Sequence, residues 1–150
     1  MRRADYTGRL IFVYWMPAVL WAAIVLGASN DHFSSQHSGH WIDEIVVRLI
    51  HHPLPQRQTD VLNFLIRKAA HVTEYGILAG LCFRALRGDE RGWRMRWAWT
   101  AVALAASVAV VDEWHQFFVP SRSSSGWDVL LDVAGAALGC WGAGLLGRHA

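Results

Sequence analysis

The stretch that decides the fold is LIFVYWMPAVLWAAIVLGA, residues 10–28, a run of nineteen residues without a charge. A helix of this length extends about 28 Å, which is close to the hydrocarbon thickness of a bilayer. Arg2 and Arg3 lie before the run and small residues follow it, as in a signal peptide, but the apolar stretch is longer than a normal signal core. The run therefore predicts a retained membrane-spanning helix, and a buried core helix and a cleaved signal peptide are the alternatives.

Three further stretches have the length and composition of membrane spans. Residues 97–118 and 128–146 are largely apolar. Residues 61–84 contain several ionisable side chains, but their apolar segment 76–83 favours a helix that crosses the membrane. The whole chain, residues 1–150, is therefore predicted to be a single all-α domain, an integral membrane four-helix bundle.

Composition and charge placement agree with a membrane protein. The chain is 53% hydrophobic and only 17% charged, against roughly 25% charged residues in an ordinary soluble domain. A net charge of +2 is too small to favour nucleic-acid binding. Four spans place nine lysines and arginines on the side of the N-terminus and five on the other side. Because lysine and arginine are enriched on the cytoplasmic side, both termini are predicted to be cytoplasmic, in a multi-pass protein of the plasma membrane.

The connection between the first two spans, residues 29–60, is the predicted outer loop. Apolar residues within 41–50 recur at helical spacing, and Asp43, Glu44 and Arg48 take the opposite face. This pattern predicts a short amphipathic helix that lies in the membrane interface, or a re-entrant helix that covers the outer ends of the spans. The five histidines of the loop lack the rigid spacing of a metal site, so they are interpreted as surface residues.

Ionisable groups inside the predicted spans are the most informative residues, because each costs about 2.5–3.5 kcal/mol near the bilayer centre. Counting along the helices from the inner arginines places Glu74 about 15 Å, and Asp112 and Asp132 each about 24 Å, from the inner side. Three helices therefore place polar groups in one layer toward the outer side, and within each helix these groups share a face. The three stripes are Lys68, His71, Glu74 and Tyr75; Asp112, His115 and Gln116; and Asp128, Asp132 and Gly135.

This polar layer has two interpretations. The first is an internal ion-pair network that only holds the bundle together. The second is a pocket open to the outer leaflet, in which His71, Glu74, Asp112 and His115 are the candidate catalytic residues for proton transfer. The same four side chains are possible metal ligands, but their spacing is not a specific metal signature. No metal or cofactor is therefore predicted.

The loop after the third span adds further candidate residues. Pro120 ends the helix. Arg122 is expected at the membrane surface, with a guanidinium group suited to phosphate or carboxylate. Ser125 is placed to cap the next span, and Asp128 lies in its first turn, where a negative charge also favours the helix N-terminus.

Small residues inside the spans predict close packing. Gly135 and Gly139 form a GxxxG pattern, which allows two helices to approach closely within the bundle. Cys82 and Cys140 lie in apolar stretches, so they are interpreted as packing residues rather than as a disulfide or metal pair.

Two ordered motifs carry a family resemblance. Residues 67–75 read RKAAHVTEY and residues 112–122 read DEWHQFFVPSR. They resemble the RKxxHxxEY and DExxQxxxPxR signatures of the VanZ-like family of membrane proteins, and the resemblance is close over residues 61–140. Asp132 departs from the family pattern, which usually has asparagine there. The pattern continues through Ser125, Asp128, Gly135 and Gly139.

The resemblance implies a small protein of the bacterial inner membrane. The namesake of the family is linked to low-level resistance to the glycopeptide teicoplanin, and the family name supplies no reaction. We therefore expect a cell-envelope protein that binds or acts on lipid or lipid-linked substrates, and whether it is an enzyme stays open. The alternatives are a non-catalytic lipid-binding, glycopeptide-binding or scaffold protein, and a small proton-coupled transporter. The expected substrate contacts are Lys68, Tyr75, Gln116, Arg122, Ser125, Asp128 and Asp132.

Overall fold

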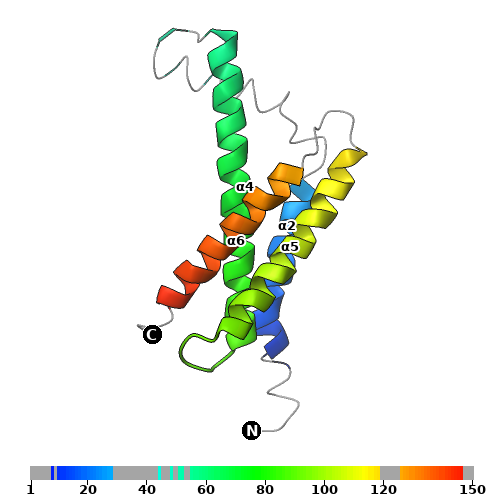
Figure 1. The fold of residues 1–150 in the computed structure, drawn as a ribbon, viewed down its shortest axis with the longest axis vertical. Coiled ribbons are helices and arrows are strands. Elements are labelled where there is room, and N and C mark those ends of the chain that lie inside the picture. The colour runs from blue at the N-terminus through cyan, green and yellow to red at the C-terminus, as the bar shows by residue number, and fades with distance from the viewer. Residues whose placement is uncertain are drawn as a thin grey trace.

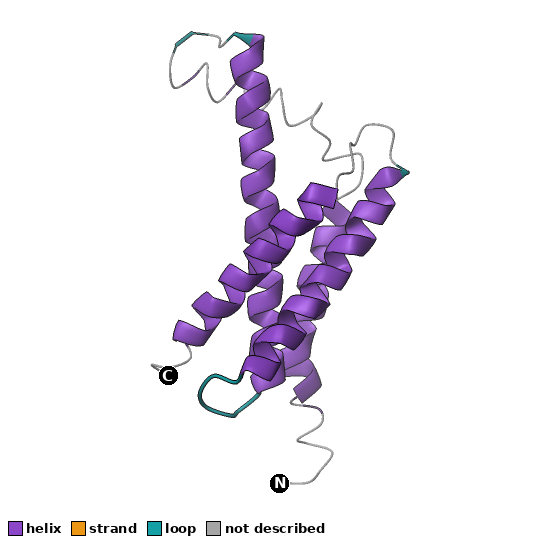
Figure 2. Ribbon diagram, in the orientation of Figure 1, coloured by secondary structure: helices purple, strands orange, loops and turns teal. Residues whose placement is uncertain are grey.

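Every regular element in the described part of the chain is a helix, and Figure 2 shows no strand in it. The computed structural model describes Gly8, residues 10–28, Glu44, Arg48, and residues 51–52, 55–118 and 126–146. Its elements are the π-helix η1 (Leu10–Trp15) and the α-helices α2 (Met16–Ala28), α4 (Gln56–Arg87), α5 (Met95–Phe117) and α6 (Gly126–Leu146). The all-α prediction is confirmed for these residues.

Three helical stretches are long and apolar enough to cross a membrane, namely Ile11–Ala28, Met95–Phe117 and Gly126–Leu146. They fit a membrane protein. Helix α4 is longer, with 32 residues, but its polar side chains keep it out of this group. The span predicted at residues 61–84 is therefore helical, while its crossing of the membrane stays a prediction.

Helix α4 is the central element of the molecule, because it contacts α2, α5 and α6 (Figure 1). Helices α4 and α6 run in the same direction, and α2 and α5 run in the opposite one. The turn 88–94 therefore lies toward the same end as the start of η1 and the end of α6. The N-terminal part of α4 extends beyond the other helices at the opposite end.

Small residues bring the helices close together. A Cβ at Gly76 would lie 3.2 Å from the carbonyl oxygen of Gly135, and a Cβ at Gly139 would overlap the backbone of Gly76. Glycine is therefore required where α4 and α6 touch. On α5 the buried face is a row of alanines at helical spacing, formed by Ala98, Ala101, Ala105 and Ala109.

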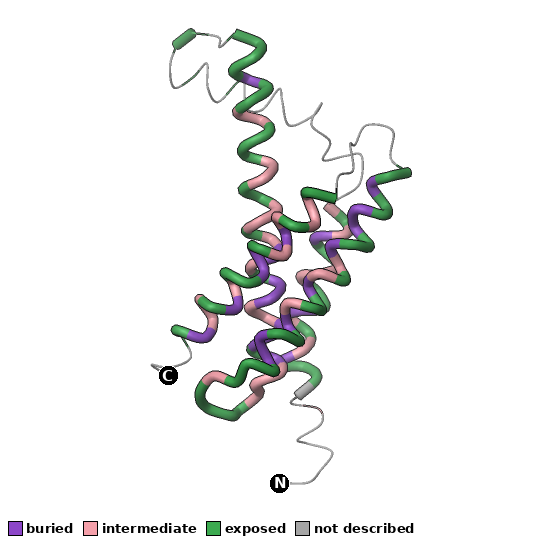
Figure 3. The backbone as a smooth tube through the Cα atoms, in the orientation of Figure 1, coloured by how far each residue is buried: buried purple, intermediate pink, exposed green. Residues whose placement is uncertain are grey.

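Large apolar side chains point away from the bundle. Trp99, Val110, Leu138 and Trp141 are all exposed, while the buried residues lie along the helix contacts (Figure 3). In water such a surface would be an unusually large apolar patch. Apolar groups outside and polar groups inside are the arrangement expected of helices surrounded by lipid.

The turn between α4 and α5 closes one end of the bundle. Gly88 ends α4 with a left-handed φ of 58°, and its N–H donates to the Arg84 carbonyl at 3.0 Å. The Tyr14 hydroxyl donates to the Asp89 carboxylate, and the Arg84 guanidinium lies 5.4 Å from the Tyr14 ring centre. These contacts fasten η1 to the end of α4.

The predicted outer loop lies mostly outside the described residues. Glu44 and Arg48 are described, both in helical conformation, and they form an ion pair of 2.7 Å at i,i+4 spacing. The rest of the amphipathic stretch 41–50 lies outside the described part, so its interfacial or re-entrant position stays a prediction.

Candidate functional site

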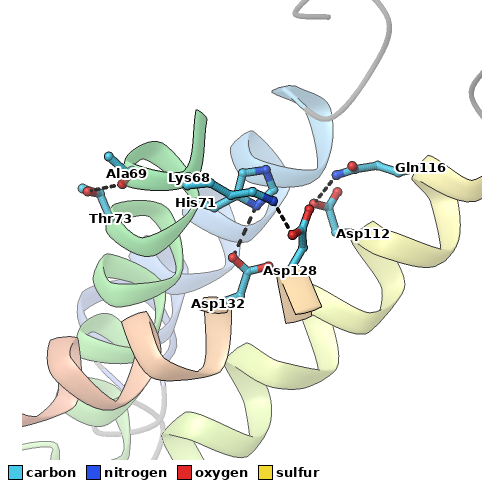
Figure 4. A network of polar contacts seen from close by, with 8 residues as sticks. All are labelled: Lys68, Ala69, His71, Thr73, Asp112, Gln116, Asp128 and Asp132. Atoms are coloured by element: carbon cyan, nitrogen blue, oxygen red, sulfur yellow. Dashed lines mark hydrogen bonds and ion pairs between the residues drawn. The ribbon is translucent and has the colours of Figure 1, made fainter. Parts of the chain in front are cut away.

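Two pairs of side chains join α4 to α6 in register (Figure 4). Lys68 Nζ donates to Asp128 Oδ1, and His71 Nδ1 lies 3.3 Å from Asp132 Oδ1. Because the two helices run parallel, residues one turn apart on α4 meet residues one turn apart on α6. The glycine contact further along the same helices holds this register.

Helix α5 supplies the third side of the cluster. Gln116 Nε2 donates to Asp112 Oδ2 at 2.9 Å, and Asp112 is only 2% exposed. The Tyr75 side chain on α4 is fully buried, and the carboxylates that act on it are those of Asp112, Asp132 and Glu74. Side chains from α4, α5 and α6 therefore meet inside the bundle.

Several buried oxygen atoms in this cluster accept no hydrogen bond from a described residue. They are Asp112 Oδ1 and both carboxylate oxygens of Asp132. The His71 and Asp132 atoms are at ion-pair distance, but their geometry is not that of a hydrogen bond. A buried polar atom without a partner destabilises a protein by about 1–3 kcal/mol. The cluster can therefore accept hydrogen bonds from a donor that is not part of the described chain.

The remaining predicted site residues lie in different places. His115 is exposed on α5, whereas Asp112 and Gln116 are buried. Arg122 and Ser125 lie outside the described residues. The structure thus brings together the polar residues of α4 and α6 with part of the α5 stripe, and leaves His115 outside the buried cluster.

Trp21 and Glu113 were not among the predicted site residues, although Glu113 lies within the DExxQxxxPxR motif. Trp21 on α2 donates from Nε1 to the Glu74 carbonyl at 2.9 Å, which fastens α2 to α4 at the level of the cluster. The sequence feature that could have indicated this contact is a tryptophan far from the ends of an apolar run. Glu113 is 8% exposed and lines an open cleft of about 360 Å³ with Trp114 and Val129. Its signal was a second acid directly after Asp112.

The two cysteines lie apart from the polar cluster, on the buried faces of α4 and α6. Cys82 and Cys140 are buried free thiols, and the Cys140 thiol lies 3.5 Å from the Ala79 carbonyl oxygen. In the part of the chain that is described, no three histidine, cysteine or carboxylate side chains are grouped so as to hold a metal ion.

Apolar helices of spanning length around a buried polar cluster fit a helical membrane protein that holds several ionisable residues in its interior. Residues 13–147 match the VanZ/LLP1 family, and the chain belongs to this family. The family resemblance of the two motifs is thereby confirmed. No curated protein and no solved structure is significantly similar to the chain.

Proposed function

We propose that the cluster binds the anionic head group of a lipid or lipid-linked cell-envelope compound, which reaches it from the outer leaflet. The carrying observation is Lys68, which is half-buried and paired with Asp128 between α4 and α6. An ammonium group has three donors, so a lysine that gives one to Asp128 keeps two for a phosphate. Arg122, at its predicted place in the outer loop, would add a second cation.

Exposure decreases along α4 in the direction that such a ligand would take. The Lys68 and Asp128 side chains are 18% and 14% exposed. The next turn inward holds His71, at 12%, and Asp132, at 1%. Tyr75 lies one turn further and is fully buried. A head group would therefore meet the lysine first and the unpaired carboxylate oxygens after it.

The same residues could also support a reaction. A histidine whose ring nitrogen faces a carboxylate, as His71 faces Asp132, is an arrangement suited to a general base. Glu74 and Asp112 are further acids whose charges act on His71. His115, which is exposed, would contact a ligand only from the side of α5.

Lipid selectivity tests the binding proposal. Full-length protein in lipid nanodiscs is titrated with phosphatidylglycerol, phosphatidylethanolamine and diacylglycerol of identical acyl chains, and bound lipid is counted by native mass spectrometry. We expect both phospholipids to bind at least about tenfold more tightly than diacylglycerol, since each charge-assisted hydrogen bond contributes about 1.5–3 kcal/mol. Equal affinities for the three lipids would contradict the proposal.

A conservative substitution separates an enzyme from a binding protein. Glu74→Asp keeps the charge but moves the carboxylate, which proton transfer tolerates far less than simple binding does. An enzyme should lose turnover of a bound lipid while keeping its affinity. Lipid that stays chemically unchanged after prolonged incubation with the wild-type protein would favour the non-catalytic alternative.

The proposed envelope role includes a contribution to glycopeptide resistance, and it is testable in a susceptible host. Cells that express the wild type should tolerate more teicoplanin than cells that express Lys68→Ala, His71→Ala or Asp112→Ala at the same membrane abundance. Vancomycin serves as the comparison drug. An unchanged inhibitory concentration for all strains would remove resistance from the proposed function.

A further inference from the structure

The polar cluster contains more acid than base. A single lysine or arginine meets these carboxylates in the described part of the chain, and His71 adds a charge only when protonated. The carboxylates of Asp128, Asp132 and Asp112 pair with these two bases or act on them. An anionic group alone would suit Lys68, but it would leave the excess of negative charge further inside without a partner.

The excess lies at two carboxylates that are each more than nine-tenths buried. Asp112 uses Oδ2 to accept from Gln116, and its Oδ1 has no hydrogen bond. Asp132 directs Oδ1 toward His71, and its Oδ2 has no hydrogen bond. The Tyr75 hydroxyl interacts with the Asp112 carboxylate, and both carboxylates are its electrostatic neighbours. These atoms can hold a small group that donates several hydrogen bonds and carries a positive charge.

The buried carboxylates of Asp112 and Asp132 form the inner acidic part of the cluster, and this part lies next to Lys68. Lys68 lies level with Asp128, and Asp132 is one helical turn further inside on α6. One turn advances about 5.4 Å. A phosphate and an ammonium group joined by two carbon atoms match this separation.

We propose that the cluster takes a phosphoethanolamine head group, with the phosphate on Lys68 and the ammonium group between Asp112 and Asp132. The phosphate half of this assignment rests on the proposed function. The ammonium half rests on the unpaired carboxylate oxygens and on the fully buried Tyr75 hydroxyl beside them. A phosphocholine nitrogen has no N–H to donate and is bulkier, and phosphatidylglycerol has no cation at all, so both fit the inner acidic part poorly.

The test compares head groups on the unaltered full-length chain. Nanodisc-embedded protein is titrated with phosphatidylethanolamine, phosphatidylcholine and phosphatidylglycerol of identical acyl chains, and with water-soluble phosphoethanolamine as a competitor. We expect phosphatidylethanolamine to bind at least about tenfold more tightly than phosphatidylcholine, because the buried carboxylates lose charge-assisted hydrogen bonds with the methylated nitrogen. Competition by soluble phosphoethanolamine would identify the head group itself as the ligand, and its failure would show that the acyl chains are also required.

Two variants test whether the inner carboxylate and the Tyr75 hydroxyl cause the preference for phosphatidylethanolamine. Asp112→Asn and Tyr75→Phe should each reduce the ratio of phosphatidylethanolamine to phosphatidylcholine affinity severalfold. The matched control Asp60→Asn removes the same charge from an exposed position on α4 and should leave the ratio unchanged. Equal affinities for the two lipids in the wild type, or an unchanged ratio in both core variants, would overturn the inference. If phospholipids bind selectively but without regard to the nitrogen, the proposed function stands and only the phosphoethanolamine assignment fails.

Discussion

At the scale of single residues, the buried charge of Asp132 is expected to lower the stability of the ligand-free protein and to favour binding of a cation. Its carboxylate is 1% exposed and has an oxygen without a hydrogen bond. Asparagine is similar in size, keeps an oxygen for His71 and removes the buried charge. Burying a charge costs free energy unless the charge is paired and hydrogen-bonded, and the Asp132 carboxylate lacks the hydrogen bonds.

We therefore expect Asp132→Asn to raise the free energy of unfolding of the ligand-free protein by about 1–3 kcal/mol. The same substitution should weaken binding of an ammonium-bearing lipid. Thermal unfolding in detergent, with Asp60→Asn as the exposed control, measures the first effect. A loss of stability in Asp132→Asn would show that the charge of Asp132 stabilises the bundle.

Much of the cluster could be predicted from residue spacing, because a helix places residues three and four apart on one face. Lys68 and His71 were expected on one face, and Asp128 and Asp132 on another, and the structure pairs them across two helices. Spacing could not predict whether His115 is buried. His115 lies about 60° around the helix from Asp112, and a residue at that angle can be either buried or exposed. It also could not reveal Trp21, whose contact depends on how α2 packs.

At the scale of elements, the contact between α4 and α6 determines whether the cluster exists. Gly139 has the tightest surroundings, since a Cβ there would overlap the Gly76 carbonyl. On the same helix, a Cβ at Gly142 would meet no atom within 4 Å. The two glycines therefore form a matched pair for testing the contact.

Gly139→Ala should lower the free energy of unfolding by about 1–3 kcal/mol, because the helices must separate or distort. Gly142→Ala should leave it unchanged or raise it by up to about 1 kcal/mol through helix propensity. Thermal unfolding of both variants in the same detergent gives the comparison. Equal stability of the two variants would contradict close packing at Gly139.

The helices differ in how well hydropathy predicts them. The run 10–28 and helices α5 and α6 are apolar enough to be found by composition. Helix α4 is not, because its polar face is turned into the bundle, and that burial is invisible until its neighbours are placed. Helix α4 also begins at Gln56, five residues earlier than the predicted span, and continues to Arg87, where Gly88 ends it.

At the scale of the whole molecule, a site that opens to the outer leaflet requires that the turn 88–94 and the start of α4 lie on opposite sides of the membrane. Arg91 is exposed in the turn, and Gln56 is exposed at the start of α4. In a background with Cys82→Ala and Cys140→Ala, Gln56→Cys should react with a membrane-impermeant maleimide in intact cells. Arg91→Cys should react only after the cells are opened. The reverse pattern would place the cluster toward the cytoplasmic leaflet.

Under the proposed function, Lys68 belongs to a lipid-binding site and not only to an ion-pair network. The most direct measurement is the shift in melting temperature that phosphatidylethanolamine causes in the wild type, Lys68→Gln and Arg57→Gln, where Arg57 is exposed on the same helix. We expect the lipid-induced shift to disappear in Lys68→Gln and to persist in Arg57→Gln. A purely structural lysine would give the opposite result, namely a lower melting temperature without lipid and an unchanged lipid-induced shift.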